Sequence, residues 1–422
     1  MPEVSPQAPS PHLGIAELLM FMRGSSSPAY FNKKVRPMLY RKCGNDPEDV
    51  HDFVLQISHK YGRLYSRIAG YTNLHNPHKN LLVNINGAKV LPFGTAAGMD
   101  KDLEALHALG NVFGFQVPGT VVIRPRPGNP RVRLATIEDN KDLVNAQGFP
   151  SKGLEYALNN ITSYRNNGGR GTVYASICGL PGEGEDAISA SITEVETLAS
   201  KLGPYVNGFV WNPYSPNTAA LAKLRTREVF HDTARAIRKH AGNCLLLVKM
   251  GPYEPEDKEK SLALVSGFLE GGGNGVATTN TKMIPKEQLP ANIRDVWGYA
   301  SAGRSGRFLS EYRIRSVKDI RRRFPDAVIA ATGGIYSADE AFKAFCAGAN
   351  LVKGFTPYAY FGTGLAKELM KGVSAELAKT GTDMESLQAH IRQLARDGDT
   401  KELDKMLQGS GPAMVRERNK TN

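Results

Sequence analysis

The sequence predicts an α/β protein whose central unit is a closed (β/α)8 barrel of the TIM type. Between residues 90 and 355, short apolar segments alternate with stretches of helical character, as expected for parallel strands joined by helices. The chain of 422 residues has room for one barrel of about 250 residues with additions at both ends. An open doubly wound sheet is disfavoured, because no GxGxxG motif follows the first predicted strand.

Eight apolar segments are predicted to form the barrel strands, and the Asn86 and Gly87 pair before them is a strong signal for a hairpin turn. The segments are 90–94, 114–117, 172–177, 208–211, 244–249, 275–279, 327–331 and 350–355. The barrel domain is expected to cover residues 81–374. A helical extension with a basic tail is expected over residues 375–422.

The N-terminal region is predicted to begin with a Pro- and Ser-rich arm over residues 1–12, followed by a helical module over 13–80. Residues 13–22 are apolar but too few to span a bilayer. Another helix is expected to begin at Asp46, since this residue suits the N-cap and Pro47 suits the first helical position. Its apolar residues recur at helical spacing and form one stripe, which comprises Val50, Phe53, Val54, Ile57, Tyr61, Leu64 and Ile68.

Two interpretations of this stripe stay open. The simpler one is that it packs against the barrel, as amphipathic surface helices usually do. The other is that the N-terminal helices form a module that touches a membrane surface and admits an apolar molecule. Basic residues between the helices favour the second interpretation; they are Lys33, Lys34, Arg36, Arg41 and Lys42.

The composition limits the classes of partner. The chain carries 53 Lys and Arg against 41 Asp and Glu, and its net charge of +12 favours a phosphorylated cofactor, an acidic substrate or an anionic membrane face. Nucleic acid is not an expected partner. The 4 cysteines form no CxxC pair, so neither a metal site nor a disulfide framework is predicted. Without a long apolar run or a signal-peptide pattern, the protein is expected to be intracellular, peripheral on the cytoplasmic side of a membrane or simply cytoplasmic.

Two lysines follow predicted strands at the face where barrels of this kind carry their active sites. Small residues at 96–98 let a flat ring approach the end of the first strand, and Lys101 follows closely. Lys249 ends the apolar fifth strand, where its ammonium must either reach out of the barrel mouth or meet a negative charge inside it. A fixed cation there would stabilise the negative charge that develops on a reduced flavin.

Glycines and hydroxyl residues follow the last two predicted strands, where this fold binds phosphate through backbone N–H groups at a helix start. They are Gly333 and Gly334 after the seventh strand, Gly354, Phe355 and Thr356 after the eighth, and Ser305 and Gly306 on the preceding loop. Their agreement with the expected positions predicts a phosphate cradle.

Four asparagines lie at strand ends or on loops toward the same face: Asn145, Asn212, Asn217 and Asn280. A carboxamide offers both a donor and an acceptor, which suits a cyclic urea or imide with alternating N–H and C=O groups. Together the asparagines therefore predict a pocket that recognises a polar planar ring.

Several motifs together resemble those of the dihydroorotate dehydrogenase family. The segment WNPYSPNT at 211–218 resembles the family's Asn-x-x-Ser-Pro-Asn-Thr loop, and further motifs occur in the family's order over residues 35–372. These are AAGMDK at 96–101, PGNPR at 127–131, NAQGF at 145–149, LVKM at 247–250, TTNT at 278–281, SGR at 305–307 and ATGGI at 331–335. The serine at position 215 and the N-terminal helices are most like the quinone-linked, membrane-associated class.

The resemblance implies FMN-dependent oxidation of dihydroorotate to orotate in pyrimidine biosynthesis, with electrons passed to a quinone. Ser215 would take the C5 proton of dihydroorotate while hydride leaves C6, and Thr218 with a water would relay that proton. The substrate would be held by Lys101, Asn145, Asn212, Asn217, Asn280 and Thr281, with Phe149 covering the pocket. FMN would be held by Ala97, Gly98, Lys101, Thr120, Asn145, Ser176, Asn212, Lys249, Thr279, Ser305, Gly306, Gly333, Gly334, Phe355 and Thr356.

The chain departs from the family pattern at several positions. Ser176 stands where the family usually has asparagine, Ala135 and Thr136 replace a Phe-Arg pair, and Phe355 replaces a common tyrosine. The changes at 136 and 355 remove polar groups near the acceptor tunnel of the quinone-linked class. A related barrel that uses fumarate or NAD, or that acts on another dihydropyrimidine, is therefore an alternative. A non-catalytic barrel is disfavoured, because Ser215, both lysines and all four asparagines are retained together.

Overall fold

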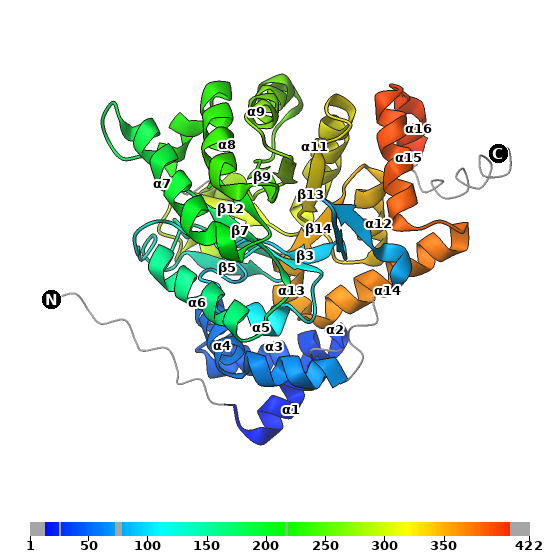
Figure 1. The fold of residues 1–422 in the computed structure, drawn as a ribbon. Coiled ribbons are helices and arrows are strands. Elements are labelled where there is room, and N and C mark those ends of the chain that lie inside the picture. The colour runs from blue at the N-terminus through cyan, green and yellow to red at the C-terminus, as the bar shows by residue number, and fades with distance from the viewer. Residues whose placement is uncertain (1–12, 25–26, 72–77, 216–217, 406–422) are drawn as a thin grey trace.

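The structure, a computed structural model, describes residues 13–24, 27–71, 78–215 and 218–405 and confirms the predicted barrel (Figure 1). Its parallel strands close into a ring in the order β10-β13-β14-β3-β4-β7-β8-β9. In chain order they are β3 (Phe93–Thr95), β4 (Phe115–Gln116), β7 (Thr172–Ile177), β8 (Gly208–Trp211), β9 (Leu245–Lys249), β10 (Gly275–Thr278), β13 (Val328–Thr332) and β14 (Leu351–Gly354). The strands read as continuous apolar runs because side chains fill the barrel and helices cover it.

The predicted hairpin turn precedes the barrel, but the hairpin includes a residue that was predicted to begin the first barrel strand. Val83–Ile85 (β1) pairs antiparallel with Ala88–Val90 (β2), and Asn86 and Gly87 between them have positive φ values of 47° and 84°. Residue 90 therefore belongs to this hairpin, and the first barrel strand begins only at Phe93.

The helices around the barrel bury an apolar face against the strands. In α8 (Arg227–Ala241), the Thr226 side chain accepts a hydrogen bond from the Val229 N–H, and Phe230 and Ile237 on the inner face are buried. The other helices after the hairpin are α5 (Leu106–Leu109), α6 (Leu154–Asn166), α7 (Ala187–Leu202), α9 (Lys258–Glu270), α10 (Ala291–Arg294), α11 (Ser310–Arg323), α12 (Ala338–Cys346), α13 (Thr356–Phe361), α14 (Gly364–Thr380), α15 (Met384–Arg396) and α16 (Thr400–Lys405).

A second, four-stranded antiparallel sheet was not predicted. Its order is β11 (Lys282–Pro285), β12 (Ser301–Ser305), β6 (Asp142–Asn145) and β5 (Leu134–Ile137). The sheet has its own apolar core around the buried Trp297, Val144 and Ile284. Asn145 and Ser305, which the sequence placed on loops, are instead the last residues of β6 and β12, so hydrogen-bonded strands fix their positions.

The N-terminal helices lie together at one end of the molecule (Figure 1). They are α1 (Ile15–Gly24), α2 (Pro28–Tyr30), a π-helical segment (Phe31–Val35), α3 (Arg36–Lys42) and α4 (Pro47–Tyr71). The predicted cap of α4 is confirmed, because Asp46 Oδ1 accepts hydrogen bonds from the N–H groups of Glu48 (2.7 Å) and Asp49 (3.2 Å).

The predicted apolar stripe of α4 divides between two environments. Phe53 and Ile57 are buried in a small core with Val35 and Leu39 from the preceding helical segments. Elsewhere α4 approaches the barrel, since a Cβ added to Gly62 would lie 3.2 Å from the backbone nitrogen of Ala108. The stripe ends earlier than predicted: Leu64 is 56% exposed, and the side chain of Ile68 lies outside the described residues, as does the predicted arm over 1–12.

Within the described ranges, no helix combines enough length and apolarity to cross a bilayer. The same residues contain no group of His, Cys, Asp and Glu side chains arranged to hold a metal ion. Cys43, Cys178, Cys244 and Cys346 are free thiols.

Candidate functional site

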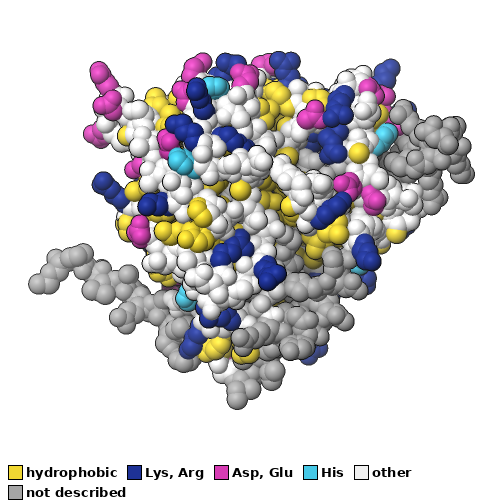
Figure 2. Space-filling view, viewed as in Figure 1, with side chains coloured by type: hydrophobic (Ala, Val, Ile, Leu, Met, Phe, Trp, Pro, Cys, Tyr) yellow, Lys and Arg dark blue, Asp and Glu magenta, His cyan; other side chains and the backbone are white. Residues whose placement is uncertain are grey.

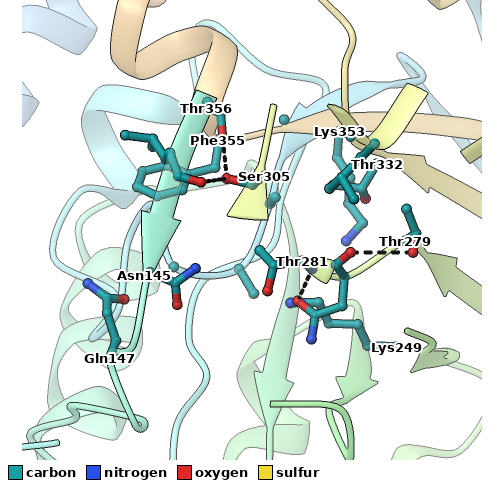
Figure 3. Close-up of a pocket in the computed structure, with 18 of the residues that line it drawn as sticks. Asn145, Gln147, Lys249, Thr279, Thr281, Ser305, Thr332, Lys353, Phe355 and Thr356 are labelled. Carbon is teal, nitrogen blue, oxygen red and sulfur yellow. Dashed lines mark hydrogen bonds between the residues drawn. The ribbon is translucent and has the colours of Figure 1, made fainter. Parts of the chain in front are cut away.

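A cavity of about 1150 Å³, partly continuous with solvent, lies at the carboxyl ends of the barrel strands (Figure 3). Because all the barrel strands are parallel, residues that end different strands meet there. Of the predicted site residues, the cavity is lined by Ala97, Gly98, Lys101, Thr120, Asn145, Phe149, Asn212, Ser215, Lys249, Thr279, Asn280, Thr281, Ser305, Gly306, Gly333, Gly334, Phe355 and Thr356. The residues singled out from separate motifs therefore share one cavity.

Two of the predicted residues that the structure describes do not line this cavity. Ser176 is fully buried behind Thr120, and their hydroxyl oxygens lie 2.9 Å apart. Thr218 lies beside Ser215 rather than on the cavity wall. Asn217 lies outside the described residues.

Contacts on both sides hold the serine loop against the cavity. The Asn280 side chain donates a hydrogen bond to the carbonyl of Tyr214, and Asn212 Oδ1 accepts one from the Tyr214 N–H (3.4 Å). Ser215 follows directly and is 9% exposed. The Thr218 hydroxyl lies 3.5 Å from the Ser215 oxygen, which is the outer limit for a hydrogen bond. The loop thus presents Ser215 to the cavity with a second hydroxyl behind it.

A chain of polar groups fixes the orientation of Asn212 at the end of β8. Its carboxamide nitrogen donates to the Thr120 hydroxyl over 2.9 Å, and that hydroxyl also contacts Ser176. Thr120 and Asn212 both line the cavity, so Ser176 is linked to the cavity wall through its contact with the Thr120 hydroxyl.

Lysines at the cavity wall have lost much of their hydration. Burial lowers the pKa of Lys249 to about 8. Lys353, which was not predicted as a site residue, lies on β14 and is 2% exposed; burial and then the charge of Lys249 lower its pKa to about 7. In the described part of the chain, no Asp or Glu forms an ion pair with either lysine. Two unpaired ammonium groups make the cavity suited to an anion.

Lys101 differs from these lysines because it faces acidic groups of α4. Its Nζ lies 3.8 Å from Glu48 Oε1 and 3.9 Å from Asp52 Oδ1. Burial alone would raise the pKa of Glu48, but Arg133, Lys101 and Arg131 outweigh burial and keep this pKa below its usual value. The helix α4, part of the predicted N-terminal module, is thus tied electrostatically to the cavity.

The predicted phosphate cradle lies on the same cavity. Gly334 has a φ of +65°, and an added Cβ would lie 2.1 Å from Ser310 Oγ, so only glycine fits this turn. The Arg313 guanidinium donates to the carbonyl of Gly333, which holds the turn in place. Nearby, the hydroxyl oxygens of Ser305 and Thr356 lie 2.9 Å apart (Figure 3).

Several cavity residues were missed. They include Gln147, Leu309, Ile335 and Lys353. Thr332 ends β13, and its buried hydroxyl has no hydrogen-bond partner in the described structure. Lys353 carried a usable signal, since a lysine within the otherwise uncharged run 350–355 is as unusual as Lys249 in its strand.

A second cavity, of about 790 Å³ and partly continuous with solvent, lies between the N-terminal helices and the barrel mouth. Its lining is mostly apolar and includes Leu39, Val50, Val54, Leu55, Leu109 and Tyr358. His51 also lines it: its Nε2 lies 2.9 Å from the Met99 carbonyl oxygen, and its Nδ1 lies 4.0 Å from Asp52 Oδ1. Burial, followed by the charge of Lys101, lowers the pKa of His51 to about 4. Phe355, Leu134 and Leu143 line both cavities and form the wall between them.

Comparisons with known proteins agree with the motifs. A family model for dihydroorotate dehydrogenases matches residues 80–377. A dihydroorotate dehydrogenase (quinone) of Salinispora arenicola is 32% identical over 357 residues, covering 80% of this chain and 97% of the relative. One of Corynebacterium striatum is 31% identical over 294 residues, covering 69% of this chain and 79% of the relative.

Solved structures agree as well. The crystal structure of a DHODH from Eimeria tenella in complex with ferulenol superimposes with a TM-score of 0.70 at 25% identity. The match covers 82% of this chain and 95% of that chain. The motifs, the barrel and the matched length agree, and this chain belongs to the dihydroorotate dehydrogenase family.

Proposed function

We propose that the protein catalyses FMN-dependent oxidation of dihydroorotate to orotate and passes the electrons to a quinone. The observation that carries this proposal is the shared cavity, where Ser215, Lys249 and the carboxamides of Asn145, Asn212 and Asn280 lie together although they are far apart in the sequence. Family membership supports the reaction, and relatives named dihydroorotate dehydrogenase (quinone) support the acceptor.

The residues present fit FMN. The open space at Gly98, where an added Cβ would meet nothing within 4 Å, leaves room for a flat ring. The turn at Gly333 and Gly334 and the start of α13 offer backbone N–H groups to the phosphate. The unpartnered Thr332 hydroxyl can bond a polar group of the cofactor, and Lys249 suits the ring edge that becomes negative.

Bound FMN would accept the hydride that leaves C6 of the substrate. The task left to the chain is to remove the C5 proton, and Ser215 is the proposed base, which its position on the cavity lining supports. An unassisted hydroxyl is a weak base, so the proton must pass on, and the neighbouring Thr218 hydroxyl with a water gives it a route. Lys101 and the asparagines would hold the carboxylate and the ring, and Phe149 would keep bulk water out.

The first test is uptake of FMN followed by anaerobic addition of dihydroorotate. The protein is expected to bind FMN, and dihydroorotate should bleach the flavin absorbance. A protein that refuses FMN would support a non-catalytic barrel. A loaded protein that dihydroorotate leaves yellow would point to another dihydropyrimidine as substrate.

The second cavity is the proposed quinone site. It is apolar, and Phe355 in its wall also lines the main cavity, so a quinone there would lie one side chain from the flavin. Arg36 supplies a cation at this cavity and pairs with Glu138 at 2.6 Å, although Thr136 lacks the arginine of related proteins. An apolar quinone ring with polar carbonyls matches this lining.

Filling the second cavity should block the acceptor without affecting the substrate. Val54→Trp is expected to slow flavin reoxidation by a ubiquinone analogue about tenfold or more, the usual cost of a misfit in an apolar pocket. Reduction by dihydroorotate should be unchanged. The control is Leu64→Trp, since Leu64 lies on the same helix but is 56% exposed. Equal quinone rates for Val54→Trp and wild type, or rapid reoxidation by fumarate or NAD instead, would contradict the assignment.

The N-terminal helices are the proposed contact with an anionic membrane. Lys33, Lys34 and Arg41 are exposed on them, and Figure 2 shows Lys and Arg at this end whereas Asp and Glu are visible mainly over the barrel helices. The protein should sediment with vesicles that contain anionic lipid but not with neutral vesicles, and charge reversal at Lys33 and Lys34 should weaken the binding. Failure to bind either vesicle would exclude this contact.

A further inference from the structure

Lys353 is a buried charged residue that neither the motifs nor the proposed reaction uses. It lies on β14 between Val352 and Gly354, is 2% exposed, and lines the main cavity. The flanking strands β13 and β3 contain no charged residue. The side chain therefore enters the cavity from an uncharged wall.

The charged group that acts on the pKa of Lys353 is another cation. Lys249 extends into the same part of the cavity from β9 (Figure 3), and its charge acts on Lys353. The acidic groups of α12, which covers β14 from outside, are engaged elsewhere: Asp339 pairs with Lys343 at 2.8 Å and Glu340 with Arg307 at 3.0 Å. Two like charges in a desolvated space raise the free energy of the empty protein, and an anion placed between them removes that cost.

We propose that Lys353 is a second cation for the flavin, which acts with Lys249 to bind the reduced, anionic ring more tightly than the oxidised, neutral ring. This inference rests on the proposed function, since it requires FMN in the cavity. A hydride from the substrate brings two electrons and one hydrogen to a neutral ring and leaves that ring with one negative charge. The chain meets the new charge with two ammonium groups, which favours electron transfer from dihydroorotate.

A different anion would leave a different signature. If Lys353 bound the FMN phosphate, its removal would weaken oxidised and reduced FMN by the same factor, because the phosphate charge is the same in both. If it bound the substrate carboxylate, FMN binding in the absence of substrate would not change. Only a contact with the ring changes the ratio of the two affinities.

The test measures the dissociation constant of oxidised FMN and the midpoint potential of bound FMN, which together give the affinity of the reduced form. Lys353→Met is expected to lower the preference for reduced FMN about tenfold, or about 30 mV for a two-electron couple. The control is Lys343→Met, which removes the same charge from the exposed face of α12 and should leave the potential unchanged.

Lys353→Gln provides a second neutral variant, and thermal unfolding of the FMN-free proteins shows whether each is folded. The inference would be overturned if both variants kept the wild-type preference for reduced FMN, or if they lost affinity for oxidised and reduced FMN equally. Either result would leave the proposed function standing, because the wild type still binds FMN. A wild-type protein that binds no FMN would overturn the proposed function and this inference with it.

Discussion

Replacing Ser215 with alanine is expected to slow reduction of the bound flavin by dihydroorotate by about 10²- to 10⁴-fold, the usual contribution of a positioned base. The hydroxyl lies at the cavity, and Asn212 and Asn280 anchor the residue before it. The loop should therefore keep its shape in the variant, so that the loss reflects chemistry. Anaerobic stopped-flow measurement of flavin absorbance gives the rate constant directly.

Two comparison variants make this result specific. Ser189→Ala removes an exposed hydroxyl on α7 and should reduce the flavin at the wild-type rate. Ser215→Cys keeps a group that can accept a proton and should retain more activity than Ser215→Ala. An alanine variant that reduces flavin at full speed would remove Ser215 from the mechanism.

Replacing Lys249 with methionine should lower the same rate constant by about 10²- to 10³-fold, the cost of removing one group that stabilises developing negative charge. Methionine has similar length and no charge, so the change isolates the ammonium. In the empty cavity the pKa of Lys249 is about 8, and a lysine is charged below its pKa. Binding of reduced FMN to the wild type should therefore weaken as the pH rises through about 8, and the variant should lose this step.

The control for this variant is Lys239→Met on α8. Lys239 is exposed and pairs with Glu196 at the surface, so its removal changes the net charge equally without touching the cavity. If both variants lowered the rate constant of flavin reduction by the same factor, the effect of Lys249 would be only long-range electrostatics. That outcome would contradict a role at the ring.

The sequence predicted the barrel and most of the cavity because parallel strands place their carboxyl ends together. Once the strands were located, Lys101, Lys249 and the Gly333 turn could be assigned to one face of the barrel without knowledge of any interatomic distance. Strand ends shifted by one to three residues, as for the first strand, do not change this assignment.

The four-stranded antiparallel sheet was missed for a physical reason. Its strands are short and do not alternate cleanly between buried and exposed positions, as 282–285 and 301–305 show. β5 pairs with β6 and β11 with β12 between segments close in the sequence, but these two pairs are joined into one sheet by pairing between distant segments, such as Gly303 with Asn145. No local pattern reports that pairing. The position of Asn145 therefore required tertiary structure.

Lys353 and Leu64 illustrate opposite errors of local reasoning. Lys353 lies inside a strand rather than at its end, so a rule that assigns site residues to strand ends does not predict it. Leu64 continues the helical spacing of α4, but the helix extends past the elements that cover the stripe, so the residue is exposed. Periodicity predicts a face of a helix and not the length over which a partner covers it.

A crystal structure of the FMN-loaded protein with orotate would test the central claim most directly. We expect the FMN phosphate at the Gly333 and Gly334 turn, and orotate against the ring with Ser215 Oγ within about 2.6–3.2 Å of the substrate or one water away. Orotate bound elsewhere, or a ring out of reach of both Ser215 and Lys249, would contradict the account.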